Sequence, residues 1–281
     1  MSPFLDRAAV LARRDRFLAG LGARPRVMGI LNVTPDSFSD GGRFDGLDAA
    51  LAQARRMAEE GADIIDIGAE STRPGHTPVP EAREMARLQP LLAPLAADID
   101  LPFSVDTSKA AVARQAVAWG ASVINDVRGL QHDPAMADVV AETGAAVVVM
   151  HHREEKDESL DIRADMRRFF ERSLGLAERA GVLRGRILLD PGIGFGKTKE
   201  QNLAALADVG DLARDFGLPV LVGVSRKSIF GLLLGAEVDA RLIGTLAANL
   251  ACAARGAHVF RVHDVAEHVA AFKVFDAIAR A

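Results

Sequence analysis

Residues 48–73 of the 281-residue chain read DAALAQARRMAEEGADIIDIGAESTR. Apolar residues recur three and four positions apart over Asp48–Glu60, a spacing that predicts an amphipathic helix. Gly61 follows where a left-handed helix cap is favoured, and the β-branched run Ile64–Ile67 predicts a buried strand. Polar residues 70–73 come shortly after it. The segment therefore predicts a helix–strand unit whose strand leads into polar side chains.

The same arrangement recurs along the chain. Including Ile64–Ile67, the predicted strands are Val27–Leu31, Phe103–Val105, Ser122–Ile124, Ala146–Met150, Ile187–Leu189, Val220–Val222 and His258–Val262. Besides Asp48–Glu60, the clearest helical patterns are Lys109–Trp119, Ala164–Ala180, Ala240–Ala254 and Val265–Ala279. Eight alternating units in about 250 residues predict an α/β fold, the TIM (β/α)8 barrel. An open doubly wound sheet stays an alternative, because periodicity does not show whether a sheet closes.

The chain is expected to form a single barrel domain. Residues 1–25 precede the first strand and predict an N-terminal helical extension that covers the bottom of the barrel, while residues 26–281 form the barrel. Segments 32–46 and 151–162 are polar and are predicted to be loops. Glycines follow helical patterns and precede strands at Gly61, Gly120, Gly144, Gly181, Gly217 and Gly256, where left-handed caps are expected.

Composition excludes several classes of protein. The formal net charge of −4, from 34 Lys+Arg and 38 Asp+Glu, argues against a nucleic-acid-binding face, which usually carries surplus basic residues. No run of about 18 apolar residues occurs, so no membrane-spanning helix is expected. The single Cys252 excludes an internal disulfide and a multi-cysteine zinc site. Because Met1–Arg16 also lacks the apolar stretch of a secretory signal, we expect a cytoplasmic protein without nucleic-acid or membrane partners.

Polar side chains follow nearly every predicted strand. In chain order they are Asn32, Glu70–Arg73, Asp106, Asn125–Asp126, His151, Asp190, Ser225–Lys227, Arg261 and His263. In a (β/α)8 barrel the carboxyl ends of all strands open on one face, where catalysis occurs. Loop starts alone explain one or two such positions, but not acids, amides and bases at nearly every strand end. These residues are therefore candidates for one active site.

The candidates divide into two chemical groups. Carboxylate and amide groups suit a flat heterocycle with several N–H donors and ring nitrogens, and are offered by Asp106, Asn125 and Asp190. A cationic, donor-rich group suits phosphate or pyrophosphate, and is offered by Arg73, Arg261, His263 and Thr72. Lys227 fits either role, since it could bond the heterocycle or offset developing negative charge. Any single arginine here could equally be a solvated surface residue.

Three motifs fall short of known patterns. Pro191–Thr198 resembles a phosphate-binding Walker A loop, but Pro191 stands where that pattern requires glycine, and Lys197 takes the place of the third glycine of a dinucleotide fingerprint. A glycine loop that lets backbone approach a flat ligand fits better. Asp36 and Asp40 lack the closing Glu of a calcium loop, and the histidines lack zinc-ligand spacing.

Longer motifs make a family resemblance specific. Residues 28–42, MGILNVTPDSFSDGG, resemble the first signature of the dihydropteroate synthases. Residues 61–75, GADIIDIGAESTRPG, resemble the second. Further matches lie in the family's order at 104–107, 124–127, 190–197, 223–228 and 261–265. The resemblance covers about residues 26–275, and a fifteen-residue match is far more specific than a short motif.

The resemblance implies a folate-pathway transferase on a TIM barrel, usually a homodimer. Such an enzyme condenses 6-hydroxymethyl-7,8-dihydropterin diphosphate with 4-aminobenzoate, giving 7,8-dihydropteroate and pyrophosphate. Carried over by motif, the pterin-binding residues are Asp106, Asn125, Asp190 and Lys227. The diphosphate-binding residues are Asn32, Thr72, Arg73, Arg261 and His263, with Asn32 also meeting Mg²⁺. The aminobenzoate pocket, which sulfonamides would share, is formed by Phe38, Pro74, Phe195 and Ser228, and Met150 is a further substrate-binding residue.

The residue chemistry agrees with that reaction. An aromatic amine is already a neutral nucleophile, so no strong general base or Ser/His/Asp triad is needed. The difficulty lies in losing pyrophosphate from a CH₂ centre and stabilising the cationic pterin. Mg²⁺, two arginines and a histidine would stabilise the leaving group, while Asp106 or Asp190 would favour the electron-poor ring. We expect the loop 32–46 to close over the site and exclude water.

One segment differs from the family pattern, and two alternative functions have to be compared with this one. After His151 the chain reads HREEKD, where the family commonly has a short Gly- and Pro-containing stretch, and we interpret this segment as a charged solvated loop. Pterin-binding methyltransferases would share Asp106, Asn125 and Asp190 but would not need the diphosphate group. A non-enzymatic pterin-binding barrel would be marked by loss of loop or anion-binding residues, which this chain retains.

Overall fold

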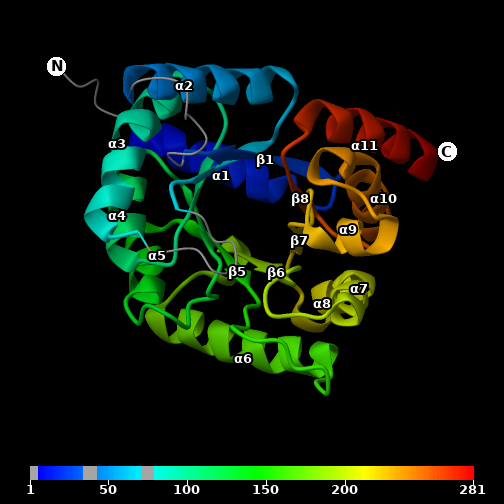
Figure 1. The fold of residues 1–281 in the computed structure, drawn as a ribbon. Helices are drawn as coiled ribbons and strands as arrows, with labels where there is room; N and C mark the ends of the chain where they lie inside the picture. Colours follow the sequence, from blue (N-terminus) through cyan, green and yellow to red (C-terminus); the bar gives the residue numbers. More distant parts are fainter. Residues whose placement is uncertain (1–5, 34–42, 71–78) are drawn as a thin grey trace.

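The computed structural model describes residues 6–33, 43–70 and 79–281, and within them helices surround a sheet of eight strands (Figure 1). The strands are β1 (Arg26–Asn32), β2 (Ile64–Gly68), β3 (Phe103–Asp106), β4 (Val123–Asp126), β5 (Ala146–Met150), β6 (Ile187–Asp190), β7 (Leu221–Val222) and β8 (Val259–Val262). Each overlaps a predicted run, and no bound differs from the prediction by more than two residues. The alternation of apolar runs and helices therefore located the whole sheet.

Most of the α-helices cover the outside of the sheet, and α1 crosses one end of it. They are α1 (Arg7–Ala19), α2 (Arg43–Glu59), α3 (Glu81–Asp98), α4 (Ala110–Ala118), α5 (Met136–Thr143), α6 (Ile162–Ala180), α7 (Lys199–Ala207), α8 (Val209–Phe216), α9 (Ser228–Leu234), α10 (Leu242–Ala253) and α11 (Val265–Ala279). Two 3₁₀ turns are η2 (Arg184–Arg186) and η3 (Val238–Ala240). Within the described ranges, no helix is both long and apolar enough to cross a membrane.

The sheet curves into a barrel. Its strand order is β6-β5-β4-β3-β2-β1-β8-β7, all pairs are parallel, and β1 pairs with both β2 and β8. A single bridge between Leu189 and Val220 joins the two ends of this order. The predicted TIM-like barrel is thus confirmed over the open doubly wound sheet, and the junction of β6 with the two-residue β7 is its thinnest seam.

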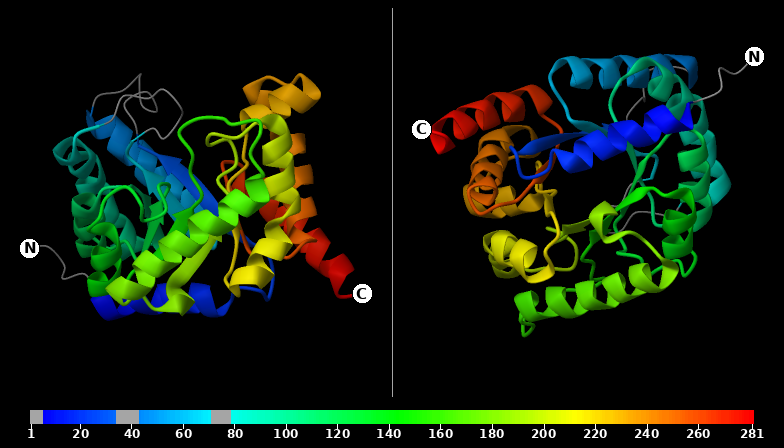
Figure 2. Two further views of the ribbon diagram at one scale, coloured as in Figure 1. Left: turned by 90° about the horizontal axis from the view of Figure 1, so that it is seen from below. Right: turned by 180° about the vertical axis from the view of Figure 1, so that it is seen from behind.

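The N-terminal extension forms a helix at one end of the barrel, as predicted. Figure 2 shows α1 crossing the ends of the strands at which the chain enters the sheet. Phe17 of α1 is buried and packs into the core inside the barrel, together with Met28, Ile64 and Val259 from three strands. Because burial of a Phe side chain contributes about 1.5–3 kcal/mol, this contact fixes the helix to the barrel.

The predicted glycine caps are confirmed in their backbone geometry. All six have positive φ, and three end helices directly as left-handed C-caps: Gly144 after α5, Gly181 after α6 and Gly217 after α8. The start of the helix predicted over Asp48–Glu60 and the extent of the loop before it are less accurate. Of the predicted loop 32–46, the structure describes little, and α2 begins at Arg43, before the predicted Asp48.

Candidate active site

Side chains from four strands meet at the carboxyl end of the barrel. Arg261 of β8 donates from Nε to Asp66 Oδ2 (2.6 Å) and from Nη2 to Asp106 Oδ2 (3.2 Å). Asn125 of β4 donates from Nδ2 to Asp66 Oδ2 (3.2 Å). The structure therefore brings the predicted residues Asp106, Asn125 and Arg261 into one hydrogen-bonded network around a single site.

Asp66, at the centre of this network, was not among the predicted site residues. It lies within the apolar run of β2, and its side chain is fully buried. Three of the four residues in the predicted run Ile64–Ile67 are isoleucine, so its apolar pattern indicates a buried strand and gives no sign of a functional acid. An acid inside a short β-branched run was the available signal, since a buried charge is costly unless it is paired.

Three buried oxygen atoms of the network accept no hydrogen bond from the residues that the structure describes. They are Asp66 Oδ1, Asp106 Oδ1 and Asn125 Oδ1. A buried acceptor left unpaired costs about 1–3 kcal/mol, so such a group needs an explanation, such as a ligand that donates to it. Burial raises the pKa of Asp106 to about 7, although the charge of Arg261 works in the opposite direction. The network therefore presents acceptors for an N–H-rich ligand.

Asp190, at the end of β6, faces the same space. Its Oδ1 accepts from the backbone N–H of Gly192 (2.7 Å), and burial raises its pKa. A Cβ on Gly223 would stand 3.6 Å from Asp190 Oδ2 and 3.9 Å from Arg261 Cβ. Gly223 thus lies between the two side chains, and the absence of a side chain there leaves room at the rim.

Lys227 reaches across the rim to the loop after β6. Its Nζ donates to the Ile193 carbonyl and lies 4.7 Å from the centre of the Phe195 ring, within cation–π range. Burial lowers the pKa of Lys227 to about 8. The predicted residues Lys227, Asp190 and Phe195 are therefore brought together, with Lys227 charged at neutral pH.

The glycine loop 191–198 acts as a scaffold rather than as a phosphate cradle. Buried Lys197 points back into its own loop and donates to the carbonyls of Gly192 (2.7 Å) and Phe195 (3.2 Å). Gly192, Gly194 and Gly196 all have positive φ. Since Lys197 is occupied by backbone, the rejection of a Walker A loop agrees with the structure, and Phe195 is held facing Lys227.

Two consecutive residues after β7, Ser225 and Arg226, have different partners. Ser225 Oγ lies 2.9 Å from His263 Nδ1 and accepts from the His263 backbone N–H (3.2 Å), so it fixes this histidine beside the rim. Arg226, in contrast, pairs with Asp264 and has a left-handed φ of 55°. Its backbone N–H donates to Thr245 Oγ1 (3.1 Å). Arg226 thus stabilises the turn, while Ser225 orients His263.

The loop after β5 agrees only in part with the charged solvated segment that we predicted from His152 onward. His151 is fully buried and bonds through Nε2 to Asp165 Oδ2 (3.1 Å), and burial lowers its pKa to about 3. His152 is half-buried, with its ring centre 5.6 Å from that of Phe195 and its Nε2 2.8 Å from Arg128 Nη1. Glu154, Glu155 and Lys156 are exposed as expected, while Asp157 is half-buried. The segment that departs from the family pattern therefore begins with His152, whose ring packs against that of Phe195.

The structure describes only some of the remaining predicted site residues. Asn32 is exposed at the end of β1, with Oδ1 3.4 Å from where a Cβ on Gly68 would stand. Met150 is buried at the end of β5, and Ser228 is exposed at the first residue of α9. Other predicted site residues lie outside the described ranges: Phe38, Thr72, Arg73 and Pro74. Among described residues, no group of three His, Cys, Asp or Glu could hold a metal ion.

Known proteins are similar to this chain over nearly its whole length. Residues 28–263 match the family of pterin binding enzymes. The dihydropteroate synthase of Clostridium beijerinckii is 44% identical over 261 residues, which cover 92% of this chain and 96% of that protein.

Solved structures are similar to a comparable extent. A Clostridium difficile dihydropteroate synthase crystallised in the presence of pteroic acid has a TM-score of 0.89 at 45% identity, covering 93% of this chain and 99% of that one. A Xanthomonas albilineans dihydropteroate synthase with 4-aminobenzoic acid has a TM-score of 0.88 at 48% identity, covering 92% and 94%.

Proposed function

This chain belongs to the dihydropteroate synthase family of pterin-binding enzymes, and from that premise we propose how its rim carries out the reaction. The reaction joins 6-hydroxymethyl-7,8-dihydropterin diphosphate to 4-aminobenzoate, forming 7,8-dihydropteroate and pyrophosphate. The observation that carries the proposal is the network of Asp66, Asp106, Asn125 and Arg261, whose three unpaired buried oxygens match the donors of a pterin ring.

The pterin is held at the bottom of this rim. The unpaired oxygens of Asp106 and Asn125 accept from its ring and amino N–H groups, and Asp190 adds a second carboxylate beside them. Lys227 supplies a donor for the acceptor atoms of the ring. Because Arg261 already bonds both Asp66 and Asp106, it also fixes the orientation of the acids that bind the ring.

The diphosphate lies on the outer, cationic side of the pterin. Arg261 is about one fifth exposed, and its Nη1 makes none of the hydrogen bonds that hold Asp66 and Asp106. We expect Arg261 Nη1 and His263 to bind phosphoryl oxygens, and the contact of Ser225 with His263 supports this role. The sequence motif adds Thr72 and Arg73 to this group.

The residues at the end of β1 fit a magnesium ion bound mainly through substrate. Mg²⁺ usually keeps several waters and takes one or two protein oxygens together with phosphate oxygens. Asn32 offers such an oxygen, directed over the adjacent end of β2, and a site of this kind does not require a cluster of carboxylates. When bound, the ion would neutralise charge on the departing pyrophosphate.

The 4-aminobenzoate pocket is proposed beside Phe195. Phe195 is flanked by the Lys227 ammonium and by His152, while Met150 lies buried at the neighbouring strand end. Exposed Ser228 at the start of α9 is positioned to meet the carboxylate. By motif, Phe38 and Pro74 complete the pocket. Sulfonamides resemble this substrate in shape and would compete for the same space.

The chemical step is substitution at the CH₂ group of the pterin. The C–O bond to the diphosphate breaks and its electron pair leaves with pyrophosphate, while the amine lone pair forms the new C–N bond and its proton is released. Arg261 and His263 stabilise the negative charge on the leaving group. Asp106 and Asp190 favour the positive charge that develops on the pterin. The amine needs no base before it attacks, because it is already neutral.

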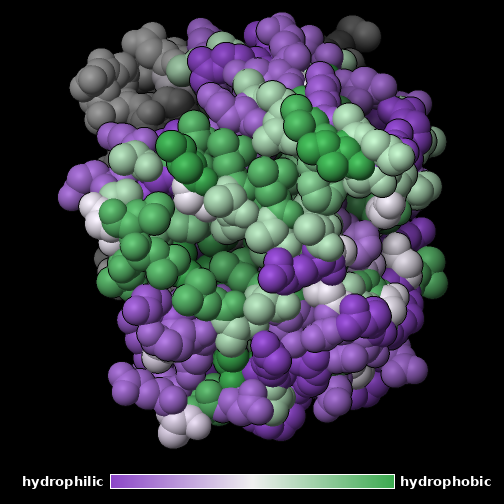
Figure 3. All heavy atoms as spheres, turned by 90° about the vertical axis from the view of Figure 1, so that its right-hand side faces the viewer, coloured by the Kyte–Doolittle hydropathy of each residue, from purple (hydrophilic) through white to green (hydrophobic). Residues whose placement is uncertain are grey.

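We also propose a homodimer that forms through the face of α9, α10 and α11. Figure 3 shows a broad apolar area on the side of the molecule where these helices lie. Its large apolar side chains are more than half exposed and include Leu232, Leu234, Ile243, Val274 and Ile278. Contiguous apolar areas of this kind usually mark protein interfaces. A monomeric mass for the wild type in light scattering would exclude the dimer, and Ile243→Lys should convert a dimer to monomers.

Two further expectations belong with this function. We propose that residues 26–281 form one domain to which 1–25 is an extension, supported by Phe17 in the barrel core. A cytoplasmic location is supported by the lone buried Cys252, because oxidising compartments favour disulfide-rich proteins.

The decisive test is turnover by purified protein. Pyrophosphate release is measured with pterin diphosphate, 4-aminobenzoate and Mg²⁺, omitting each in turn. We expect release to require all three. Pterin binding without turnover would favour a non-enzymatic barrel, and methyl transfer from a methylated folate to a corrinoid protein would favour the methyltransferases instead.

A further inference from the structure

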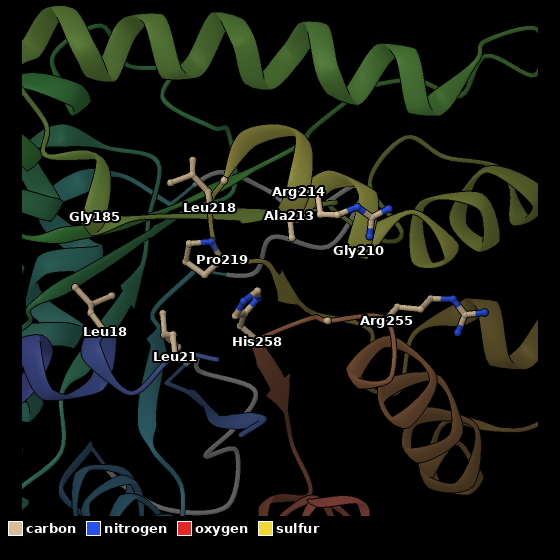
Figure 4. Close-up of a pocket in the computed structure, with 12 residues that line it drawn as sticks. Leu18, Leu21, Gly185, Gly210, Ala213, Arg214, Leu218, Pro219, Arg255 and His258 are labelled. Carbon is tan, nitrogen blue, oxygen red and sulfur yellow. The ribbon is translucent and has the colours of Figure 1, made fainter. Parts of the chain in front are cut away.

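Polar side chains at the end of the barrel opposite the active site do not converge on one point. A hollow of about 560 Å³ lies there below β7 and β8, and its polar side chains are Arg214, Arg255 and His258. Figure 4 shows both guanidinium groups pointing away from the His258 ring. A converging set of polar atoms lies instead at the active-site end, around the amino group of Lys197 in the loop after β6.

Lys197 Nζ lies within hydrogen-bond distance of three backbone carbonyl groups from two different loops. It donates to the carbonyls of Gly192 (2.7 Å) and Phe195 (3.2 Å), and a longer contact reaches the His151 carbonyl (3.4 Å). The first two carbonyls belong to the loop after β6, whereas His151 directly follows β5. A protonated lysine has three N–H donors, one for each of these oxygens. One amino group therefore connects the ends of two neighbouring strands.

The two loops pack backbone against backbone, and two glycines make this approach possible. A Cβ on Gly192 would collide with the His151 carbonyl oxygen, and a Cβ on Gly196 would collide with the Arg153 carbonyl oxygen. Both glycines also have positive φ, which other residues rarely adopt. The loop after β6 thus lies directly against residues 151–153, and Lys197 bonds across the junction of the two loops.

Each of these loops contributes one ring to the wall proposed for 4-aminobenzoate. Phe195 comes from the loop after β6 and His152 from the loop after β5, and their ring centres are 5.6 Å apart. Lys197 bonds the carbonyl of Phe195 itself, and its longer contact is to the residue directly before His152. The spacing of the two rings is therefore set by backbone that Lys197 holds in both loops.

Stability alone does not account for a lysine at this position. Its side chain is only 2% exposed, and burial lowers the pKa of Lys197 to about 7, although the charge of Asp190 works in the opposite direction. Among the described residues, its hydrogen-bond acceptors are carbonyl oxygens and not carboxylates. Replacing buried ionic groups by apolar side chains of similar volume is often neutral or stabilising, whereas an ionic group can specify one arrangement of the chain. The amino group therefore indicates a positioning role.

We propose that Lys197 is a positioning residue for the arylamine: it joins the loops after β5 and β6, and so fixes the spacing of His152 and Phe195 on which the affinity for 4-aminobenzoate depends. This inference rests on the proposed function. The pterin, in contrast, is held mainly by the network around Asp106 and Asn125 on β3 and β4. Lys197 should therefore affect the KM for one substrate more than the KM for the other.

The test compares steady-state kinetics of the wild type and of Lys197→Met, which keeps a similar volume and removes the N–H donors. The measurements are made at pH 6, where Lys197 of the wild type holds its proton. We expect the KM for 4-aminobenzoate to rise about tenfold, the size of effect that loss of one charge-assisted hydrogen bond produces. The KM for the pterin diphosphate should change by less than about twofold, because the network that binds the ring stays intact.

Two further variants make the comparison specific. Arg14→Met is the matched control, because Arg14 is also a buried base that donates to a backbone carbonyl, that of Gly144, but it lies on α1 at the other end of the barrel. Both of its KM values should match those of the wild type. Lys197→Gln keeps an amide donor, so it should raise the KM for 4-aminobenzoate by less than Lys197→Met does. It also provides the measurement if Lys197→Met does not fold.

A double variant separates positioning from a general loss of structure. If Lys197 acts by fixing His152 against Phe195, part of the contribution of the His152 ring is already lost in Lys197→Met. His152→Ala should therefore raise the KM for 4-aminobenzoate by a smaller factor in the Lys197→Met background than in the wild type. Residues that act independently would instead give factors that multiply.

Three results would each overturn the role of Lys197 while the wild type turns over. They are wild-type kinetics in the Lys197 variants, equal rises of both KM values, and multiplying factors in the double variant. If the wild type itself releases no pyrophosphate, the proposed function fails and this inference fails with it. The two failures are therefore distinguished by the wild-type measurement.

Discussion

Arg261 on β8 and Asp66 on β2 are joined across the barrel mouth by a 2.6 Å hydrogen bond from Nε to Oδ2. The same guanidinium reaches Asp106 through Nη2. One cation therefore holds two buried acids in place, and in the proposed reaction its Nη1 group also binds the diphosphate. Removing it affects both functions, the binding of anion and the placement of the acids.

For this reason we expect Arg261→Ala to raise the KM for the pterin diphosphate by at least about tenfold and to lower kcat, since the loss of one charge-assisted hydrogen bond costs about 1.5–3 kcal/mol. The KM should also become sensitive to ionic strength, because salt screens the electrostatic contacts to the diphosphate that remain. Steady-state kinetics at several ionic strengths provide the measurement. Arg226→Ala, which removes a neighbouring arginine that pairs with Asp264, is the matched control. Unchanged kinetics in Arg261→Ala would contradict its assignment.

Asp106 gives a prediction about pH. Burial raises its pKa to about 7, from an ordinary value of 3.8, so in the folded protein it binds its proton more tightly than in the unfolded chain. Between these two values the folded state holds more protons, and the contribution of Asp106 to the free energy of unfolding therefore falls as pH rises. Asp106→Asn lacks this dependence. The melting temperature of Asp106→Asn minus that of the wild type should therefore be larger at pH 8 than at pH 5. Thermal unfolding of both proteins at the two pH values measures this difference.

The same variant should bind pterin poorly. Asparagine keeps the volume of the side chain but replaces a carboxylate oxygen with an amide donor, which mismatches the N–H groups of the ring. We expect pterin affinity to fall at least about tenfold while the affinity for free pyrophosphate changes little. Calorimetry with each ligand distinguishes the two effects, and wild-type pterin affinity would refute the role of Asp106.

Most of the barrel could be predicted because its strands are short β-branched runs between amphipathic helices. Periodicity does not report closure, so the bridge of Leu189 with Val220 had to come from the structure. Residues at strand ends were found by their polar chemistry. Asp66 was missed because it lies inside an apolar run, and the separate roles of Ser225 and Arg226 were not visible because spacing does not show which partner a side chain chooses.

Lys227 gives a second pH prediction, on activity. Burial lowers its pKa to about 8, so it is charged at neutral pH and loses its charge as pH rises through 8. If the ammonium supports binding or departure of the anion, kcat/KM should fall above pH 8. Lys227→Arg keeps a charge throughout this range and should lose that alkaline decline, at a lower overall rate because its geometry differs. A profile in Lys227→Arg that still declines around pH 8 would assign the decline to another group.

His152 is expected to influence arylamine recognition. Its ring packs against Phe195, which forms the proposed wall for 4-aminobenzoate, and Arg128 holds it in place. Loss of such an aromatic pair costs about 0.5–1.5 kcal/mol, so His152→Ala should raise the KM for 4-aminobenzoate by about threefold to tenfold. The KM for the pterin diphosphate should stay unchanged. Glu155→Ala, on the exposed part of the same loop, serves as the control, and a sulfonamide inhibition constant should follow the KM for 4-aminobenzoate.

Phe17 tests whether the N-terminal helix is part of the folded barrel. It is buried at the end of the barrel opposite the active site, among Met28, Ile64 and Val259. Phe17→Ala should lower the free energy of unfolding by about 3–5 kcal/mol, because it leaves a cavity in the core that its neighbours fill only in part. Arg16→Ala, which removes an exposed ion pair with Asp100, should cost less than about 1 kcal/mol. Urea unfolding gives both values. Since the substrates bind at the other end, KM values for Phe17→Ala below its melting temperature should match wild type, and a Phe17→Ala variant as stable as Arg16→Ala would show that the barrel does not depend on α1.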